Sequence, residues 1–141
     1  MKKLTYIISW LAIVMAMIMM MILSFWEFYP YKIIEFKKRP FPIVNEQPVA
    51  RGDIVAYKID ACKFTDVVPE MTVFFVDGIV YEVPIKKKGG IGRGCAVTII
   101  FIEVPKSLPV GTYSLKLIMH YKMNPFRTIE IINTTEKFVV K

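Results

Sequence analysis

An uninterrupted apolar run near its N-terminus constrains this chain more than any other feature. The 23 residues from Leu4 to Trp26 include no charged side chain, and Met, Ile and Leu dominate their second half. As a helix, this run would be about 34 Å long, enough to cross a hydrocarbon core of about 30 Å. An aromatic cluster that suits the headgroup interface follows, namely Phe25, Trp26, Phe28, Tyr29 and Tyr31. We therefore expect residues 1–26 to be a transmembrane anchor that contacts membrane lipid through residues 4–26.

A cleaved signal peptide, a lipoprotein signal and a buried core helix fit the apolar run less well. Lys2 and Lys3 could begin a cleaved signal peptide, but such a peptide has a shorter apolar core and small residues at its cleavage site. Bulky residues occupy that place here, at 23–26. A lipoprotein signal needs a cysteine after the run, and the first one is Cys62. A buried core helix is usually shorter and amphipathic. The sequence therefore favours a retained anchor.

The charges that flank the run bear on its orientation. Basic residues lie on both sides, at Lys2 and Lys3 before it and at Lys32, Lys37, Lys38 and Arg39 after it. Counted literally, this distribution favours a cytoplasmic C-terminal part. However, long segments translocate largely regardless of charge, and a short basic start is typical of signal anchors. We therefore expect the N-terminus inside and the remainder of the chain on the extracytoplasmic side.

The remainder of the chain has the pattern of β-structure. Four prolines in residues 27–48 exclude a continuous helix and predict an extended stalk that becomes the first strand. Residues 49–141 are expected to form the β domain, because apolar residues alternate and turn signals recur about every ten residues. The expected strands are 53–62, 71–76, 79–85, 95–104 and 112–123, followed by one or two within 126–141. Asp77-Gly78 predicts a two-residue hairpin turn, and residues 86–94 a glycine-rich loop.

Residues 112–123 show the clearest alternation. One face carries five large apolar or aromatic side chains, namely Tyr113, Leu115, Leu117, Met119 and Tyr121. After residue 27, no segment has a convincing helical period. About seven short strands in about 100 residues predict an all-β fold, an antiparallel β-sandwich preceded by the single transmembrane helix.

The stretch from Leu108 to Leu115 contains Gly111-Thr112-Tyr113 and resembles the start of strand F in immunoglobulin-like and fibronectin III-like sandwiches. In those folds, a tyrosine at this corner bonds back to the preceding loop, which implies that role for Tyr113. The resemblance covers residues 40–141, although a tryptophan on strand C is missing. An anchor with such a domain also resembles small uncharacterised membrane proteins of bacteria and tailed phages, which implies no particular activity.

The resemblance also concerns the two cysteines. Cys62 ends the second expected strand and Cys95 begins the fifth. In an Ig-like sandwich, strands B and E are antiparallel neighbours, so the end of one lies beside the start of the other. The resemblance therefore implies a Cys62–Cys95 disulfide, which an exported domain favours. The alternative is two free thiols.

The chain offers little for catalysis or metal binding. Two cysteines and the distant His120 are too few for a metal site. His120 has no Ser, Cys or Asp at a motif spacing, so we expect a surface histidine. The four aspartates form no paired-carboxylate motif. We therefore expect a protein that is not an enzyme, with no catalytic residue and no cofactor. Asn133-Thr134-Thr135 matches a glycosylation sequon.

A basic glycine-rich segment follows the predicted hairpin. Its cations are Lys86, Lys87, Lys88 and Arg93. Phosphate-binding loops of this composition open a helix, whereas a strand is expected here, so a solvated loop is the simpler interpretation. With a net charge of +7, the segment is also a candidate contact for anionic lipid or a surface polymer. Nucleic-acid binding is not expected, because no aromatic residues are interleaved with these cations.

The strands at 71–76 and 95–104 are apolar on both faces. Because a lone sandwich exposes one face of each sheet to water, something should cover the second face: the stalk, a second copy or another membrane subunit. We expect the docking face to comprise Phe74, Val76, Ile100 and Ile102. The sequence thus favours a non-enzymatic module that docks on a partner protein, or on itself, at the membrane surface. The alternatives are loop-mediated binding of a polymer or anionic lipid and a phage-encoded envelope effector in lysis or exclusion.

Overall fold

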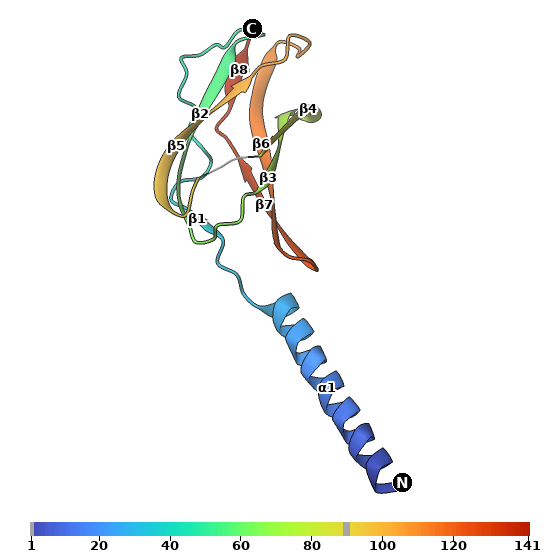
Figure 1. The fold of residues 1–141 in the computed structure, drawn as a ribbon. Coiled ribbons are helices and arrows are strands. Elements are labelled where there is room, and N and C mark those ends of the chain that lie inside the picture. The colour runs from blue at the N-terminus through green and yellow to red at the C-terminus, as the bar shows by residue number, and fades with distance from the viewer. Residues whose placement is uncertain (1, 89–90) are drawn as a thin grey trace. The chain divides into compact units, whose positions relative to one another are not determined.

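The computed structural model describes residues 2–88 and 91–141, with the side chains of residues 2 and 81–88 left aside. Within these residues the chain forms one helix and eight strands (Figure 1). The chain divides into two units. The first comprises Met1–Tyr31 with Asn124–Arg127, and the second comprises Lys32–Met123 with Thr128–Lys141.

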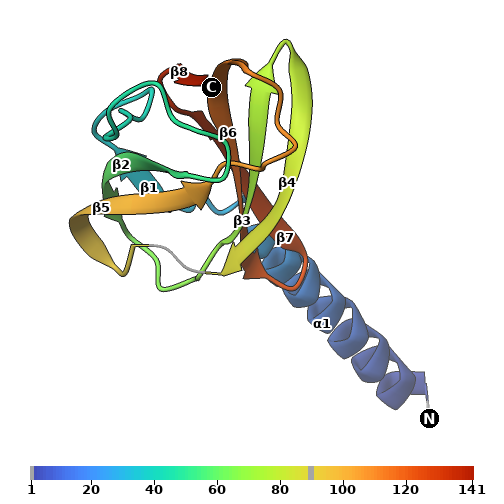
Figure 2. The same ribbon diagram turned by 90° about the horizontal axis from the view of Figure 1, so that it is seen from above.

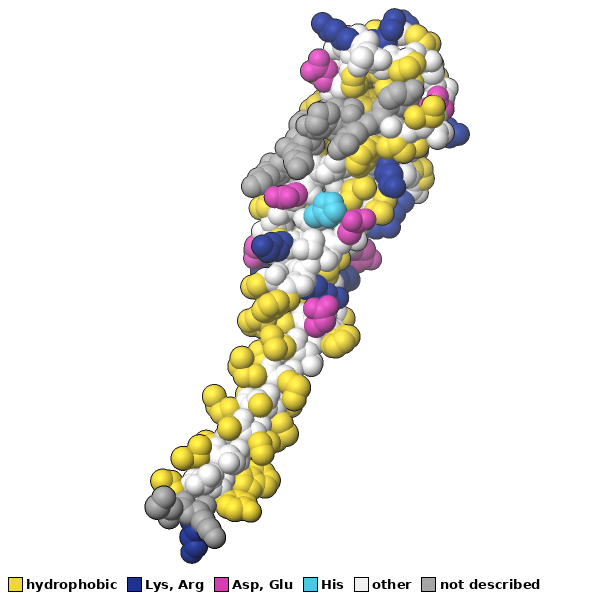
Figure 3. All heavy atoms as spheres, turned by 90° about the vertical axis from the view of Figure 1, so that its right-hand side faces the viewer, with side chains coloured by type: hydrophobic (Ala, Val, Ile, Leu, Met, Phe, Trp, Pro, Cys, Tyr) yellow, Lys and Arg dark blue, Asp and Glu magenta, His cyan; other side chains and the backbone are white. Residues whose placement is uncertain are grey.

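Helix α1 (Lys2–Phe28) ends two residues beyond the predicted boundary at Trp26. Its segment Lys3–Phe28 has a mean hydropathy of 2.5, and none of it is buried. Figure 3 shows hydrophobic side chains along the face of the helix turned to the viewer. A helix that is apolar on all sides suits lipid better than water. By length and composition, α1 can therefore span a membrane.

The C-terminal end of α1 is capped within the first unit. The Nδ2 group of Asn124 donates a hydrogen bond to the carbonyl of Trp26 at 3.0 Å. The guanidinium of Arg127 donates to the carbonyl of Tyr29 at 2.7 Å. The rings of Trp26 and Phe126 lie 6.2 Å apart. The bond from Asn124 satisfies a carbonyl group that the end of a helix leaves without an intrahelical partner, and the bond from Arg127 holds the residue directly after the helix.

The second unit contains two antiparallel sheets. One has the order β1-β2-β5, made of β1 (Ile34–Phe36), β2 (Ile54–Lys63) and β5 (Gly94–Glu103). The other has the order β4-β3-β6-β7, with β8 paired to β6. Its strands are β3 (Glu70–Asp77), β4 (Ile79–Lys88), β6 (Gly111–Asn124), β7 (Arg127–Thr134) and β8 (Phe138–Val140). Figure 2 shows the two sheets as facing layers. These orders match the A-B-E and C′-C-F-G sheets of Ig-like sandwiches, so the predicted fold class is confirmed.

The predicted alternation on β6 produces the core. Its five inward side chains, Tyr113, Leu115, Leu117, Met119 and Tyr121, are all buried. Alternate residues of β2 are buried as well, namely Val55, Tyr57, Ile59 and Ala61. The hydroxyl of Tyr113 donates to the carbonyl of Pro109 at 2.9 Å, which is the corner bond that the resemblance implied.

Most of the proline-containing segment, residues 27–48, belongs to the second unit and does not form a separate stalk. Ile33, Phe41 and Val49 are buried, and the amide of Phe41 donates to the carbonyl of Thr134 at 2.9 Å. The second unit therefore begins at Lys32 and not near residue 49. The prolines prevent a helix here, but they do not prevent packing on the sandwich.

The β3–β4 hairpin differs from its prediction in two details. Asp77 pairs with Ile79, so only Gly78, with a φ of 64°, lies between the two strands, whereas the prediction placed both Asp77 and Gly78 in the turn. Strand β4 continues to Lys88, because Lys87 and Lys88 pair with Met71 and Glu70. The backbone of residues 86–88 therefore belongs to a strand, and the prediction that it forms a loop was wrong.

Candidate functional site

The two cysteines lie opposite each other on β2 and β5 and form a disulfide, with their Cα atoms 3.9 Å apart. Cys62 is half-buried, whereas Cys95 is exposed. Because opposite residues of a strand pair share a face, both belong to the outer face of the β1-β2-β5 sheet. The bond thus fixes two strands of one sheet at the end where β2 finishes and β5 begins.

The predicted docking face was assigned to the wrong side of β5. Ile102 lies opposite Val55 and is only 1% exposed, and Ile100 lies opposite the buried Tyr57. Both side chains therefore point inward. Phe74 and Val76 on β3 do face outward, as predicted, but each is half-buried. Strand β5 is apolar on both faces, so its composition could not reveal which face is buried.

The exposed row of β5 consists of Val97, Ile99 and Phe101, which are 56%, 45% and 56% exposed. Cys95 precedes them on the same face, so the disulfide to the outward Cys62 fixes the orientation of the row. β5 also ends its sheet and leaves one edge without a paired strand among the described residues. Its sequence, GCAVTIIFIE, contains no Lys, Arg or Pro, the residues that commonly protect such edges.

A cavity of about 330 Å³ lies between the two sheets. The sandwich is closed around Val55 and Ile102, which are fully buried. Towards the start of β5, however, Thr98 and Ile100 are only half-covered. The cavity occupies this region. Apolar side chains from both sheets form most of its wall, including Ile34, Phe36, Ile59, Met71 and Met119.

Lys63 is the only charged residue in the cavity wall among the described residues. It lies opposite Ile34 and Gly94 on the inner face of its sheet and is only 4% exposed. Carboxylates on nearby segments form ion pairs with other cations: Glu35 with Lys32, Asp60 with Lys37, and Asp66 with Arg93. In the described part of the chain, no carboxylate pairs with Lys63.

Besides Lys63, the cavity wall contains two hydroxyl groups that can donate a hydrogen bond, those of Thr98 and Tyr121. The hydroxyl of Tyr121 lies 4.0 Å from the sulfur of Met119, a weak acceptor. Burial raises the pKa of Tyr121, because the tyrosinate would lose hydration. The phenol therefore stays neutral at physiological pH and keeps its proton.

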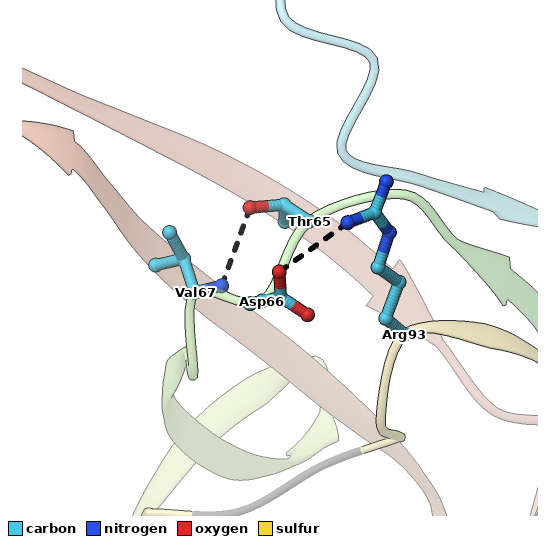
Figure 4. A network of polar contacts seen from close by, with 4 residues as sticks. All are labelled: Thr65, Asp66, Val67 and Arg93. Atoms are coloured by element: carbon cyan, nitrogen blue, oxygen red, sulfur yellow. Dashed lines mark hydrogen bonds and ion pairs between the residues drawn. The ribbon is translucent and has the colours of Figure 1, made fainter.

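Two loops, at residues 65–67 and 91–93, meet through an ion pair (Figure 4). Arg93 lies 3.5 Å from Asp66, and the hydroxyl of Thr65 accepts a hydrogen bond from the amide of Val67. Pro69 and Ile91, which flank these contacts in sequence, line the cavity. Arg93 was predicted to belong to a basic contact segment but pairs with Asp66. The side chains of its expected companions, Lys86, Lys87 and Lys88, lie outside the described residues.

The remaining candidates provide no chemical centre. His120 lies 3.6 Å from Glu130, and both side chains are partly exposed. Among the described residues, no group of three His, Cys, Asp or Glu side chains could hold a metal ion. Asn133 of the sequon is 4% exposed, so the folded chain does not present it as a glycosylation acceptor.

Comparisons with known proteins show no family. No known protein family matches the chain, and no curated protein matches it. Among solved structures, it is similar to a Niemann-Pick type C2 protein from the Japanese carpenter ant, with 12% sequence identity and a TM-score of 0.46. That alignment covers 77% of this chain and 99% of the other. A likeness this weak supports no inference about function.

Proposed function

We propose that this chain is a non-enzymatic interaction module, anchored in a membrane by α1, whose sandwich associates with a second copy through β5. One observation carries the proposal: the exposed row Val97, Ile99 and Phe101 lies on an edge strand that contains no Lys, Arg or Pro. Such an edge is a template for strand addition.

The sequence of β5 fits a second copy of itself. If two β5 strands pair antiparallel about Thr98, then Val97 lies opposite Ile99 of the second copy. In this register, Arg93, which adjoins β5 and also pairs with Asp66 of its own chain, lies opposite Glu103 of the second copy at both ends of the ladder. Apolar residues thus meet apolar residues, and cations meet anions. Anchoring both copies in one membrane would raise their effective concentration, so a small interface would suffice.

The self-association test compares two lysine substitutions in the full chain. Ile99→Lys places a charge in the proposed interface, whereas Ile132→Lys changes a similarly exposed residue of β7, which is 48% exposed. We expect sedimentation equilibrium in density-matched detergent to show dimers for the wild type and for Ile132→Lys, and monomers for Ile99→Lys. Thermal unfolding should be similar for all three proteins. A monomeric wild type, or equal effects of both substitutions, would refute the proposed association.

The anchor has a separate test. If α1 is retained in a bilayer, the protein should stay in the membrane fraction after carbonate washing, and its intact mass should include α1. A mature N-terminus near Glu27 would show instead that the apolar run is a cleaved signal sequence.

A further inference from the structure

We propose that the cavity between the two sheets binds an amphiphile with one apolar chain and an anionic headgroup, and that Lys63 contacts the headgroup. This site shares Ile99 and Phe101 with the exposed row of β5 but lies between the sheets, and its occupancy does not require self-association. Three properties support the proposal: the apolar wall, the enclosed lysine and the neutral donor Tyr121.

The wall of the cavity suits an apolar chain. Protein interiors are normally close-packed, so an open cavity of about 330 Å³ between two sheets leaves room for a ligand. Its volume is at the lower end of the range for small-molecule sites, about 300–1,000 Å³, and fits one chain better than a large ring system. Met71 and Met119 lie on facing positions of β3 and β6. Methionine side chains are flexible and can adapt to a chain of varying shape.

Lys63 supplies the preference for an anion. As a whole residue Lys63 is only 4% exposed, and lysine is rarely covered to this degree unless it is paired. The nearby carboxylates of Glu35, Asp60 and Asp66 are paired elsewhere. A carboxylate or phosphate on a bound ligand would provide the missing counter-charge through a charge-assisted hydrogen bond.

Tyr121 adds a further donor to the same cavity. Its hydroxyl contacts only the weak acceptor Met119 Sδ among the described residues, so its proton is available to a better acceptor. Asp66, the acidic group of the adjoining loop, is neutralised by Arg93 and would repel an anion less than a free carboxylate would. The polar groups at this end of the cavity therefore favour a negative headgroup.

Methionine methyl groups give a direct readout of occupancy. The full chain, labelled with ¹³C-methyl methionine and placed in nanodiscs of neutral lipid, would be titrated with octanoate, octyl phosphate or octanol. Met71 and Met119 line the cavity, whereas Met123, also in the second unit, does not and serves as an internal control. We expect octanoate or octyl phosphate to shift the Met71 and Met119 signals saturably, with Met123 unchanged. The anion that binds with the higher affinity identifies the preferred headgroup, a carboxylate for octanoate or a phosphate for octyl phosphate.

Discrimination between anion and alcohol tests the role of Lys63. For the wild type, we expect octanol to bind at least tenfold more weakly than the preferred anion, because it cannot pair with the ammonium group. Lys63→Met should abolish this difference and leave binding of octanol nearly unchanged. The control Lys58→Met, on the outer face of the same strand, should behave as the wild type. The absence of shifts, or equal affinities of the wild type for octanol and the anions, would overturn the proposal without relying on any variant.

Discussion

Tyr57 contains a buried hydroxyl group without a hydrogen-bond partner in the described part of the chain. Its side chain is fully buried and stacks on Phe41, with the ring centroids 6.2 Å apart. A buried hydroxyl that makes no hydrogen bond costs about 1–3 kcal/mol, and Tyr57→Phe removes it while keeping the ring. We therefore expect this substitution to stabilise the fold by about 1–3 kcal/mol at pH 7, and to raise the melting temperature by about 4 °C per kcal/mol.

The matched control is Tyr113→Phe, the same chemical change at a hydroxyl that donates to Pro109. It should destabilise the fold by about 0.5–1.5 kcal/mol, because that hydrogen bond is lost. Urea and thermal unfolding of the full chain in detergent, followed by circular dichroism, would measure both changes. If Tyr57→Phe destabilises the protein as Tyr113→Phe does, the Tyr57 hydroxyl has a bonding partner and the reasoning is refuted.

The stabilisation expected from Tyr57→Phe should also depend on pH, with a sign that follows from the pKa of Tyr57. Burial raises the pKa of Tyr57 above that of an unfolded tyrosine, near 10. Above pH 10, the unfolded chain therefore loses the proton while the folded chain keeps it, so stability falls as the pH rises. At pH 11, the resulting loss of folding stability reaches about 1.4 kcal/mol for one tyrosine. The advantage of Tyr57→Phe over the wild type should thus be larger at pH 11 than at pH 7, and an equal or smaller advantage would contradict the assignment.

Two further predictions concern stability. Replacing both cysteines by serine opens a bridge across 33 residues, so the midpoint of urea unfolding should fall by an amount equivalent to about 3–4 kcal/mol; an unchanged midpoint would show that the bridge contributes nothing. Asn133 has a buried amide without a partner among the described residues, so Asn133→Leu should stabilise the fold by about 1–2 kcal/mol in the same assay; destabilisation would mean that the amide is hydrogen-bonded.

Strict alternation made much of the fold predictable. On β6, four of the five large inward residues are followed by Ser, Lys or His, and only Leu117 is followed by an apolar residue, Ile118, so one orientation clearly buries the more apolar face. The Gly-x-Tyr sequence likewise identified the corner at Tyr113. β5 has no such asymmetry, because both of its faces are apolar. Its orientation depends on the register with β2, which places Ile102 opposite Val55. That register is a tertiary property.

The cavity could not be predicted for a related reason. It arises because the two sheets leave the inner face at Thr98 and Ile100 half-covered, and local sequence does not encode the separation of two sheets. The burial of Lys63 could not be predicted either, because a lysine directly after an expected strand is normally solvated. Its burial follows from the continuation of β2 by one residue beyond Cys62. The only sign of this burial in the sequence was the position of Lys63, which lies two residues after Ala61 and so shares the face of Ile59 and Ala61 if the strand continues.

The two proposed sites share β5, and this sharing predicts that they are coupled. Ile99 and Phe101 belong to the exposed row, yet both also contribute to the wall of the cavity. Pairing a second copy along β5 would restrict the strand, and a ligand in the cavity would restrict it too. Each event would then change the free energy of the other by the same amount, since coupling between binding equilibria is reciprocal. We therefore expect saturating octanoate, or octyl phosphate if it binds more tightly, to change the dimerisation constant. Under the same conditions, the affinity of the wild-type dimer for this anion should differ by the corresponding factor from that of the wild-type monomer obtained by dilution. A dimerisation constant that is unchanged by a ligand shown to occupy the cavity would establish that the two faces of β5 act independently.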